Sequence, residues 1–166
     1  MLDARQWIDR LSLIRHPEGG HYREVYRSFE LTRQEHLPKR FDGDRCFSTA
    51  IYFLLESGDF SALHRIRQDE VWHFYDGSPL TIHIIGQDGI YSSRMLGRDF
   101  DAGQEPMAVI SAGDLFGAEV SKAASFSLVG CTVAPGFDFA DFEMPAREQL
   151  LQQYGQHRNI IERLSR

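Results

Sequence analysis

The 166-residue sequence lacks long apolar runs and contains only two cysteines and six prolines. No hydrophobic stretch approaches the ~20 residues of a membrane-spanning helix, and the early charges of Asp3, Arg5 and Asp9 do not suit a signal peptide. Cys46 and Cys131 lie far apart without metal-type spacing, so we expect two buried free thiols. These absences predict a cytoplasmic protein with no membrane partner.

Positive charge is also scarce. The chain has 18 Lys and Arg against 24 Asp and Glu, a formal net charge of −6. Nucleic-acid binding requires clustered Lys and Arg that neutralise phosphates. In residues 15–35 the arginines are interrupted by glutamates. We therefore expect no nucleic-acid partner.

The chain does have enough apolar sequence, 42% of its residues, for one folded domain over residues 1–166. Turn residues recur at intervals of about ten from Gly58 onward, which is typical of an antiparallel barrel or sandwich rather than of βαβ units. The triplet Gln87-Asp88-Gly89 predicts a hairpin, and Gly130 predicts a bulge or a close backbone approach. The expected strands cover residues 21–29, 46–55, 71–75, 80–85, 90–96, 107–110 and 125–133.

Helical periodicity is confined to the two ends of the chain. Asp3 suits the N-cap of an amphipathic helix over residues 3–14, and apolar residues recur at helical spacing within residues 144–166. Residues 30–45 are charged and contain Pro38 and Gly43, which predicts a surface excursion or a mobile flap.

The stretch from Gly58 to Gly77 concentrates polar chemistry within predicted β-structure, because it brings His64 and Glu70 close together. Side chains alternate along a strand, so Glu70, Trp72 and Phe74 share one face and His73 points the other way.

This stretch resembles the first motif of the cupin superfamily, which runs glycine, His-x-His, glutamate and glycine at set intervals. The spacing is kept from Gly58 through His64 and Glu70 to Gly77, with Ile66 in place of the second histidine. The segments 17–20, 48–52 and 133–137 are similar to the fifth cupin domain family, single-domain proteins of unassigned function. The resemblance, from about residue 16 to about residue 151, implies an all-β fold. That fold is an antiparallel double-stranded β-helix, the cupin jelly-roll barrel, with an N-terminal helix and C-terminal helices.

The resemblance also bears on cofactors. Metal-binding cupins typically use three histidines and one glutamate, and the third histidine belongs to a second motif. In the corresponding stretch here, residues 111–116, only Gly113 is kept and Phe116 stands at the histidine position. A transition metal usually needs three or more protein ligands, so His64 and Glu70 alone would bind one weakly. We expect no cofactor, with a divalent metal on His64 and Glu70 as the alternative.

We expect His64 and Glu70 to face an aromatic cavity as a catalytic pair, with His64 as the base and Glu70 as its partner. The other residues expected to bind the small-molecule ligand are Tyr22, Glu24, Tyr52, Trp72, Phe74 and Phe116. Such a pair can move a proton beside a carbonyl group. By analogy with metal-free sugar epimerases of the superfamily, the sequence predicts a metal-independent isomerase or epimerase-like enzyme for a small polar, carbohydrate-like molecule.

Two other functions stay open. One is a non-catalytic binding or sensing module that uses the same cavity, with His64 and Glu70 as a satisfied buried pair. The other is a metal-dependent cupin enzyme of dioxygenase or lyase type. Tyr22 and Glu24 equally suit an edge strand with a solvated charged face.

Residues 46–55 are apolar on both faces of their strand. Only one face of a barrel strand looks inward, so the other should be covered by a second subunit or by the terminal helices. We predict a homodimer, which the cupin resemblance also implies, and keep helix cover as the alternative.

Overall fold

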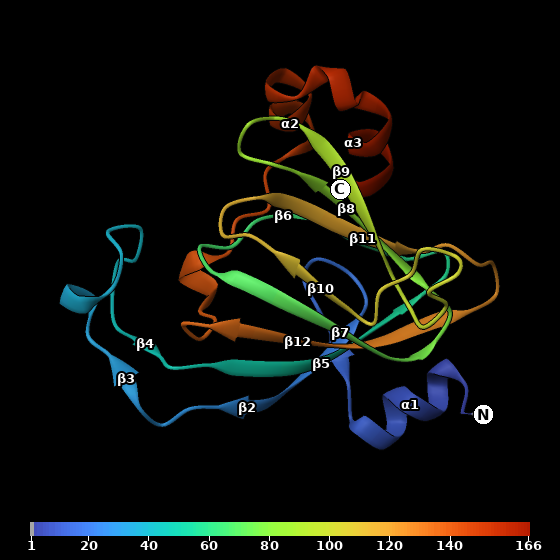
Figure 1. Ribbon diagram of the computed structural model, residues 1–166, viewed down its shortest axis with the longest axis horizontal. Coiled ribbons are helices and arrows are strands. Elements are labelled where there is room, and N and C mark those ends of the chain that lie inside the picture. Colours follow the sequence, from blue (N-terminus) through green and yellow to red (C-terminus); the bar gives the residue numbers. More distant parts are fainter. Residues whose placement is uncertain (1) are drawn as a thin grey trace.

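The computed structural model describes residues 2–166, and its long strands form two antiparallel sheets that face each other (Figure 1). The larger sheet has the strand order β1-β2-β5-β12-β7-β10, and the smaller has the order β6-β11-β8-β9. This confirms the antiparallel jelly-roll barrel. The strands of the larger sheet are β1 (Ile14–Arg15), β2 (His21–Arg27), β5 (Thr49–Glu56), β7 (Asp69–Gly77), β10 (Met107–Ile110) and β12 (Phe126–Ala134). Those of the smaller sheet are β6 (Phe60–His64), β8 (Leu80–Ile85), β9 (Tyr91–Leu96) and β11 (Leu115–Val120).

The main hydrophobic core lies between the two sheets. Phe53 and Trp72 come from the larger sheet, and Ile82 and Phe116 come from the smaller one. Each is 1% exposed or less, and the rings of Phe53 and Trp72 meet edge to face with centroids 5.7 Å apart. Alternation along each strand sends these side chains inward and their chain neighbours outward.

The predicted N-terminal helix is α1 (Ala4–Leu11), and it packs on the outer face of the larger sheet. Asp3 caps it in a reciprocal box with Gln6, and it ends where Ser12 takes a left-handed conformation. Its apolar side is packed against Leu54 of β5 and Leu128 of β12. The outer face of β5 is therefore covered at Leu54 by a terminal helix, which was the alternative to cover by a second subunit.

The C-terminal segment forms α2 (Arg147–Gln153), the 3-10 turn η3 (Gly155–His157) and α3 (Arg158–Leu164), which cover the smaller sheet (Figure 1). Leu150 and Ile161 pack with Leu63 of β6 and Leu115 of β11. The prediction of helices within residues 144–166 is therefore confirmed. None of the helices within residues 2–166 has the length and hydrophobicity required to cross a membrane.

Two predicted glycine features have different outcomes. The hairpin is present, since Gly86 donates its N–H to the Ile90 carbonyl at 3.0 Å and Gly89 has a φ of +77°. In β12 the register shift against β7 falls between Leu128 and Val129, not at Gly130. Gly130 instead leaves room for the Tyr75 ring, which an added Cβ would strike.

The predicted surface excursion projects from one side of the barrel (Figure 1) and contains β3 (Leu31–Thr32), the 3-10 turn η1 (Gln34–His36) and β4 (Arg45–Cys46). It is tied to the body by a buried ion pair, because Arg45 donates to both carboxylate oxygens of Asp141 at 2.6 and 2.7 Å. Cys46 and Cys131 are free and buried, as expected.

Candidate functional site

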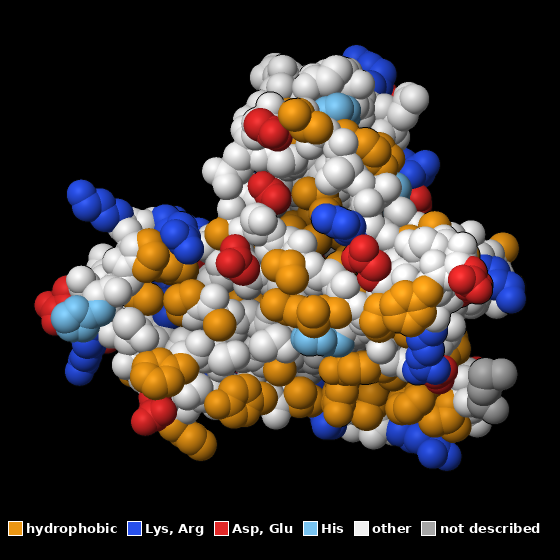
Figure 2. Space-filling model, in the orientation of Figure 1, with side chains coloured by type: hydrophobic (Ala, Val, Ile, Leu, Met, Phe, Trp, Pro, Cys, Tyr) orange, Lys and Arg blue, Asp and Glu red, His pale blue; other side chains and the backbone are white. Residues whose placement is uncertain are grey.

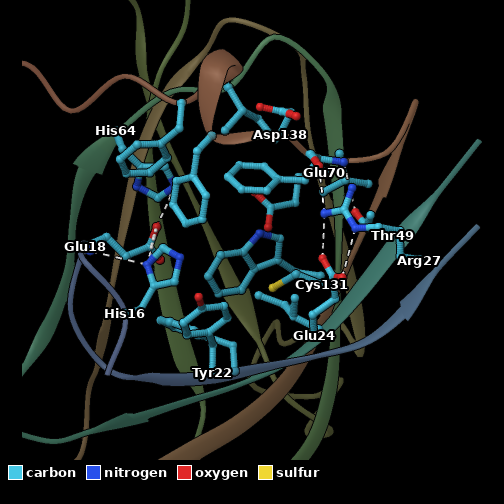
Figure 3. Close-up of a pocket in the computed structure, with 18 residues that line it drawn as sticks. His16, Glu18, Tyr22, Glu24, Arg27, Thr49, His64, Glu70, Cys131 and Asp138 are labelled. Atoms are coloured by element: carbon cyan, nitrogen blue, oxygen red, sulfur yellow. Dashed lines mark hydrogen bonds and ion pairs between the residues drawn. The ribbon is translucent and has the colours of Figure 1, made fainter. Parts of the chain in front are cut away.

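A cavity of about 440 Å³ lies between the sheets (Figure 3). Its wall comes from β2, β5, β6, β7 and β12 and from the loops around residues 16–18 and 137–142. Six aromatic side chains form much of this wall: Tyr22, Phe53, Trp72, Phe137, Phe139 and Phe142. Phe139 is 52% exposed and therefore stands at the mouth.

His64, at the end of β6, is buried against the Phe116 ring, with centroids 4.2 Å apart. Its Nδ1 lies 2.7 Å from the Ala62 carbonyl oxygen, which can only accept, so Nδ1 carries a hydrogen. Its Nε2 lies 3.1 Å from Glu18 Oε2. In the neutral ring Nε2 is an acceptor, so a proton is shared between His64 and Glu18.

Glu18 reaches this position because the loop before β2 folds tightly over β6. Gly19 and Gly20 have φ values of +120° and +69°, which favour glycine, and a Cβ on Gly19 would collide with the Phe60 carbonyl. The Ala62 N–H donates to the Glu18 carbonyl at 2.8 Å, which fixes the loop on β6. Burial raises the pKa of the Glu18 carboxyl, and Ser61 donates its hydroxyl to Oε1 at 2.8 Å.

His16 completes this side of the cavity (Figure 3). Its Nδ1 accepts the Glu18 backbone N–H at 3.3 Å and lies 3.5 Å from Glu18 Oε2. Burial lowers the pKa of both His16 and His64, so neither imidazole carries a full charge at neutral pH.

Glu70, on β7, is the second carboxyl group at the cavity wall. Burial raises its pKa to about 7, an effect that His64 opposes and the Glu18 carboxyl reinforces. The Cys131 thiol and the Trp72 indole lie beside it. No partner for Trp72 Nε1 meets hydrogen-bond geometry among the described residues. Glu70 therefore exists in both protonation states near neutral pH.

A charged pair occupies the opposite side of the cavity (Figure 3). Arg27 donates Nε and Nη2 to the two carboxylate oxygens of Glu24 at 2.9 and 2.7 Å, and Nη2 also donates to the Phe137 carbonyl at 3.1 Å. Strict alternation from Glu24 would have pointed Tyr26 inward. A register shift between Glu24 and Tyr26 reverses the alternation, so Arg27 lines the cavity and Tyr26 is 53% exposed.

Five of the predicted site residues line this one cavity: Tyr22, Glu24, His64, Glu70 and Trp72. The carboxyl group that contacts His64 is Glu18, which the sequence prediction did not include. His16 and Arg27 were missed as well. The string Pro17-Glu18-Gly19-Gly20 did predict a turn, but nothing local in it indicated that the turn folds onto β6.

Three residues predicted to bind the ligand, Tyr52, Phe74 and Phe116, do not line the cavity. Tyr52 follows Ile51 on β5 and so faces outward, where its ring lies 6.0 Å from that of Tyr75. Phe74 is on the correct face of β7 but packs against the core beyond the cavity, under the Arg98 guanidinium. Phe116 is buried behind the His64 ring.

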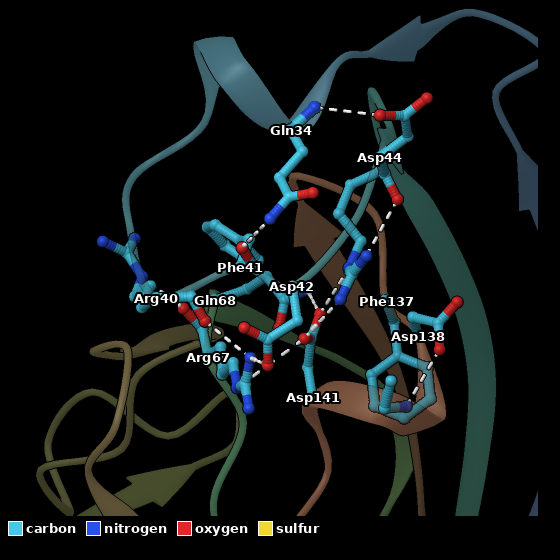
Figure 4. A network of polar contacts seen from close by, with 12 residues as sticks. Gln34, Arg40, Phe41, Asp42, Asp44, Arg67, Gln68, Phe137, Asp138 and Asp141 are labelled. Atoms are coloured by element: carbon cyan, nitrogen blue, oxygen red, sulfur yellow. Dashed lines mark hydrogen bonds and ion pairs between the residues drawn. The ribbon is translucent and has the colours of Figure 1, made fainter.

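The mouth of the cavity is held by a polar network (Figure 4). The 3-10 turn η2 (Phe139–Asp141) carries Phe139, and Phe142 follows it. Asp141 accepts both bonds from Arg45 and a third from Gln68 Nε2 at 2.6 Å. The aromatic segment 137–142 is thereby fixed to β4 and to the turn between β6 and β7.

The family model described as cupin superfamily (DUF985) matches residues 5–145. The chain belongs to this family. Among solved structures, a protein of Shewanella oneidensis shares 40% identity with this cupin over 100% of this chain and 99% of its own, with a TM-score of 0.91. A hypothetical protein from Leishmania major shares 34% identity over 99% of each chain, with a TM-score of 0.90.

A more distant structure is a mutant of Bacillus subtilis oxalate decarboxylase, at 14% identity and a TM-score of 0.56. The match covers 90% of this cupin and 36% of the decarboxylase, so the likeness shows the fold alone. No curated protein matches this cupin.

The side chains present do not fit the three-histidine, one-glutamate metal set. Ile66 lines the cavity where the second histidine would stand, and Phe116 replaces the third. Both ring nitrogens of His64 already have protein partners. Within residues 2–166, no three His, Cys, Asp or Glu side chains are arranged to hold a metal ion.

Proposed function

We propose that this protein is a metal-independent acid–base enzyme, of isomerase or epimerase type, that binds a small polar molecule in its cavity. The observation that carries the proposal is that two proton-exchanging groups, Glu70 and the His64–Glu18 pair, face one cavity lined by aromatic side chains. Hydrophobic walls with a few convergent polar groups are typical of small-molecule sites.

The two groups have complementary roles in such a reaction. In this proposal Glu70 replaces His64 as the base expected from the sequence, because His64 Nε2 is already paired with Glu18. The Glu70 carboxylate takes the proton from the carbon beside a carbonyl, and the electron pair of the broken C–H bond forms an enol double bond. The His64–Glu18 pair gives its shared proton to the carbonyl oxygen. With a 2-hydroxy carbonyl substrate the intermediate is an enediol. Glu70 then gives its proton to the former carbonyl carbon, and the second hydroxyl returns a proton to the His64–Glu18 pair as the new carbonyl forms, which yields the isomer. Glu70 suits this work because its pKa of about 7 keeps both of its forms available.

The test is hydrogen exchange on the substrate. Small aldoses and ketoses are incubated with the protein in D2O, and proton NMR follows loss of the C–H signal beside the carbonyl. We expect exchange that falls about 100-fold or more in Glu70→Gln, while Glu148→Gln on the exposed surface of α2 leaves it unchanged.

Two results would contradict the proposal. One is equal exchange in the protein and in Glu70→Gln. The other is a stoichiometric metal in the purified protein that Glu70→Gln loses, which would favour the dioxygenase or lyase alternative.

The second candidate is a non-catalytic binding or sensing module. The observation that favours it is that His64 is 3% exposed and has partners at both ring nitrogens, as a purely structural histidine would. Ligand binding that persists in His64→Ala, with no exchange on any bound compound, would support this module instead.

We also propose that the protein acts as a homodimer in the cytoplasm. Hydrophobic side chains gather over β7, β10 and β12 on the outer face of the larger sheet (Figure 2). Tyr75, Met107 and Val109 are 40–53% exposed there, beyond the part of the sheet that packs on α1. A second subunit would bury them. The two free, buried cysteines support a reducing compartment.

A further inference from the structure

The charges at the cavity wall are strongly unequal. Of the described residues that line it, four are acidic, and Arg27 is the only one with a permanent positive charge. The four acids are Glu18, Glu24, Glu70 and Asp138. Glu24 already neutralises Arg27 through two hydrogen bonds. An anionic ligand would therefore meet no uncompensated cation and up to three carboxyl groups.

The aromatic rings at the mouth have the arrangement that favours a cation. Phe137, Phe139 and Phe142 meet pairwise at interplanar angles of 72–79°, with centroids 5.1–6.4 Å apart. Three rings at steep angles to one another form a corner rather than a stack. The His16 ring lies nearly parallel to Phe139 at 6.3 Å and the His64 ring lies at 31° to Phe142 at 5.3 Å, so a cation would meet the Phe137 face and the opposite faces of the other two rings. A cation within about 6 Å of such ring centroids is attracted by the negative π faces. The network around Asp141 keeps this corner in place (Figure 4).

An unpartnered donor lies deeper in the same cavity. The Trp72 side chain is 1% exposed, and its Nε1 lies beside the Glu70 carboxyl group without reaching hydrogen-bond geometry with it or with any other described residue. A buried donor of this kind is expected to find an acceptor. A hydroxyl oxygen on the ligand would supply it.

We propose that the ligand is a small organic cation, an amine or alkylated ammonium that also carries a hydroxyl group. The inference rests on the proposed function in that it takes the same cavity as the ligand site. The positive nitrogen lies between the Phe137, Phe139 and Phe142 corner and the cavity carboxyl groups, and the hydroxyl accepts from Trp72.

Three compounds that share one bulky head group but differ in charge separate the effect of charge on binding from the effect of shape. Choline is cationic, 3,3-dimethylbutan-1-ol is its neutral counterpart, and 3,3-dimethylbutanoate is anionic. Isothermal titration calorimetry at pH 8 should show choline binding at least about tenfold more tightly than the alcohol, with no binding of the butanoate. Equal or tighter binding of the alcohol or the butanoate, or no binding of any of the three at millimolar concentration, overturns the inference.

Two cavity variants test which residues cause the preference for choline. Glu70→Gln keeps the side-chain shape and removes the charge, so the preference for choline over the alcohol should fall by about tenfold. Phe139→Leu, at an exposed position, should weaken choline severalfold and leave the alcohol unchanged, because only the π face is lost. Glu148→Gln is the control, and a preference for choline that persists in both cavity variants overturns the inference.

The two proposals fail separately. Glu70-dependent hydrogen exchange on a neutral sugar, without any choline preference, overturns the cation inference and leaves the acid–base function standing. Choline preference without exchange on any bound compound supports the cation inference and contradicts the enzyme.

Discussion

Glu70 places an ionisable group where ionisation is unfavourable. Burial among apolar side chains raises its pKa from 4.5 to about 7, with Glu18 adding to the effect. A carboxyl group of this kind reduces stability at the pH at which it would act. Acid–base sites show this conflict because the pKa that suits proton transfer is not the one that suits folding.

The variant Glu70→Gln tests how the ionisation of Glu70 changes the stability of the folded protein with pH. The folded state binds the Glu70 proton more tightly than the unfolded state, so the stability of the native protein falls as pH rises from 4.5 to about 7. The neutral amide lacks this dependence. We expect Glu70→Gln to raise the free energy of unfolding by up to about 3 kcal/mol at pH 8 and by little at pH 4.5. Urea unfolding at both pH values measures it, and an equal effect at both would contradict the assignment.

Asp141 differs from Glu70 because its buried carboxylate is paired with a positive charge and accepts hydrogen bonds at both oxygens. Its side chain is fully buried and accepts from Arg45 and Gln68. Asp141→Asn would leave the Arg45 guanidinium buried without its counter-charge. We expect a loss of about 3–5 kcal/mol in the free energy of unfolding, measured in urea.

The control for Asp141 is an exposed pair. Glu162→Gln removes the partner of Arg158 on α3, where both side chains are about half exposed. Water screens that pair, so the loss should be under about 0.5 kcal/mol. Similar losses in the two variants would contradict the stabilising role of the buried network around Asp141.

At the scale of elements, the loop 16–20 decides the chemistry of the cavity. Two left-handed glycines let it fold onto β6, and this brings Glu18 to His64. The register shift in β2 acts similarly, because it turns Arg27 inward beside Glu24. Both are local backbone irregularities that aim one side chain each.

Gly19→Ala tests the loop. The φ of +120° and the collision of a Cβ with the Phe60 carbonyl should force the loop off β6. We expect a loss of more than about 2 kcal/mol in the free energy of unfolding, together with lost activity. The control is Gly58→Ala, where φ is +91° but no atom lies within 4 Å of the added Cβ. A Gly19→Ala protein as stable and active as Gly58→Ala would contradict the role of the loop.

At the scale of the whole molecule, the two outer faces of the barrel differ. The smaller sheet packs on α2 and α3, whereas α1 packs on only part of the larger sheet (Figure 1). The part over β7 and β10 leaves Tyr75, Met107 and Val109 at the surface. The proposed dimer would use this face.

Sedimentation equilibrium tests the dimer. We expect a mass near twice the 19.1 kDa of one chain for the native protein, and a monomer for Val109→Glu, since a buried unpaired charge disfavours the interface. Val25→Glu, at an exposed site on β2, is the control and should remain dimeric. A monomeric native protein at micromolar concentration would contradict the proposal.

The sequence by itself determined the features that have a local period. Alternation indicated the strands and put Glu70 and Trp72 on one inner face, helical spacing placed the terminal helices, and the triplet 87–89 marked the hairpin. These depend on backbone geometry within a few residues, so a single chain segment contains the information.

Only the tertiary structure decided which distant groups meet. It pairs His64 with Glu18 rather than with Glu70, turns Tyr52 out of the cavity and closes the mouth with segment 137–142. Either face of an apolar strand satisfies alternation equally well, and one extra residue at a bulge reverses it. The choice depends on which other segments pack there, and that information is spread along the whole chain.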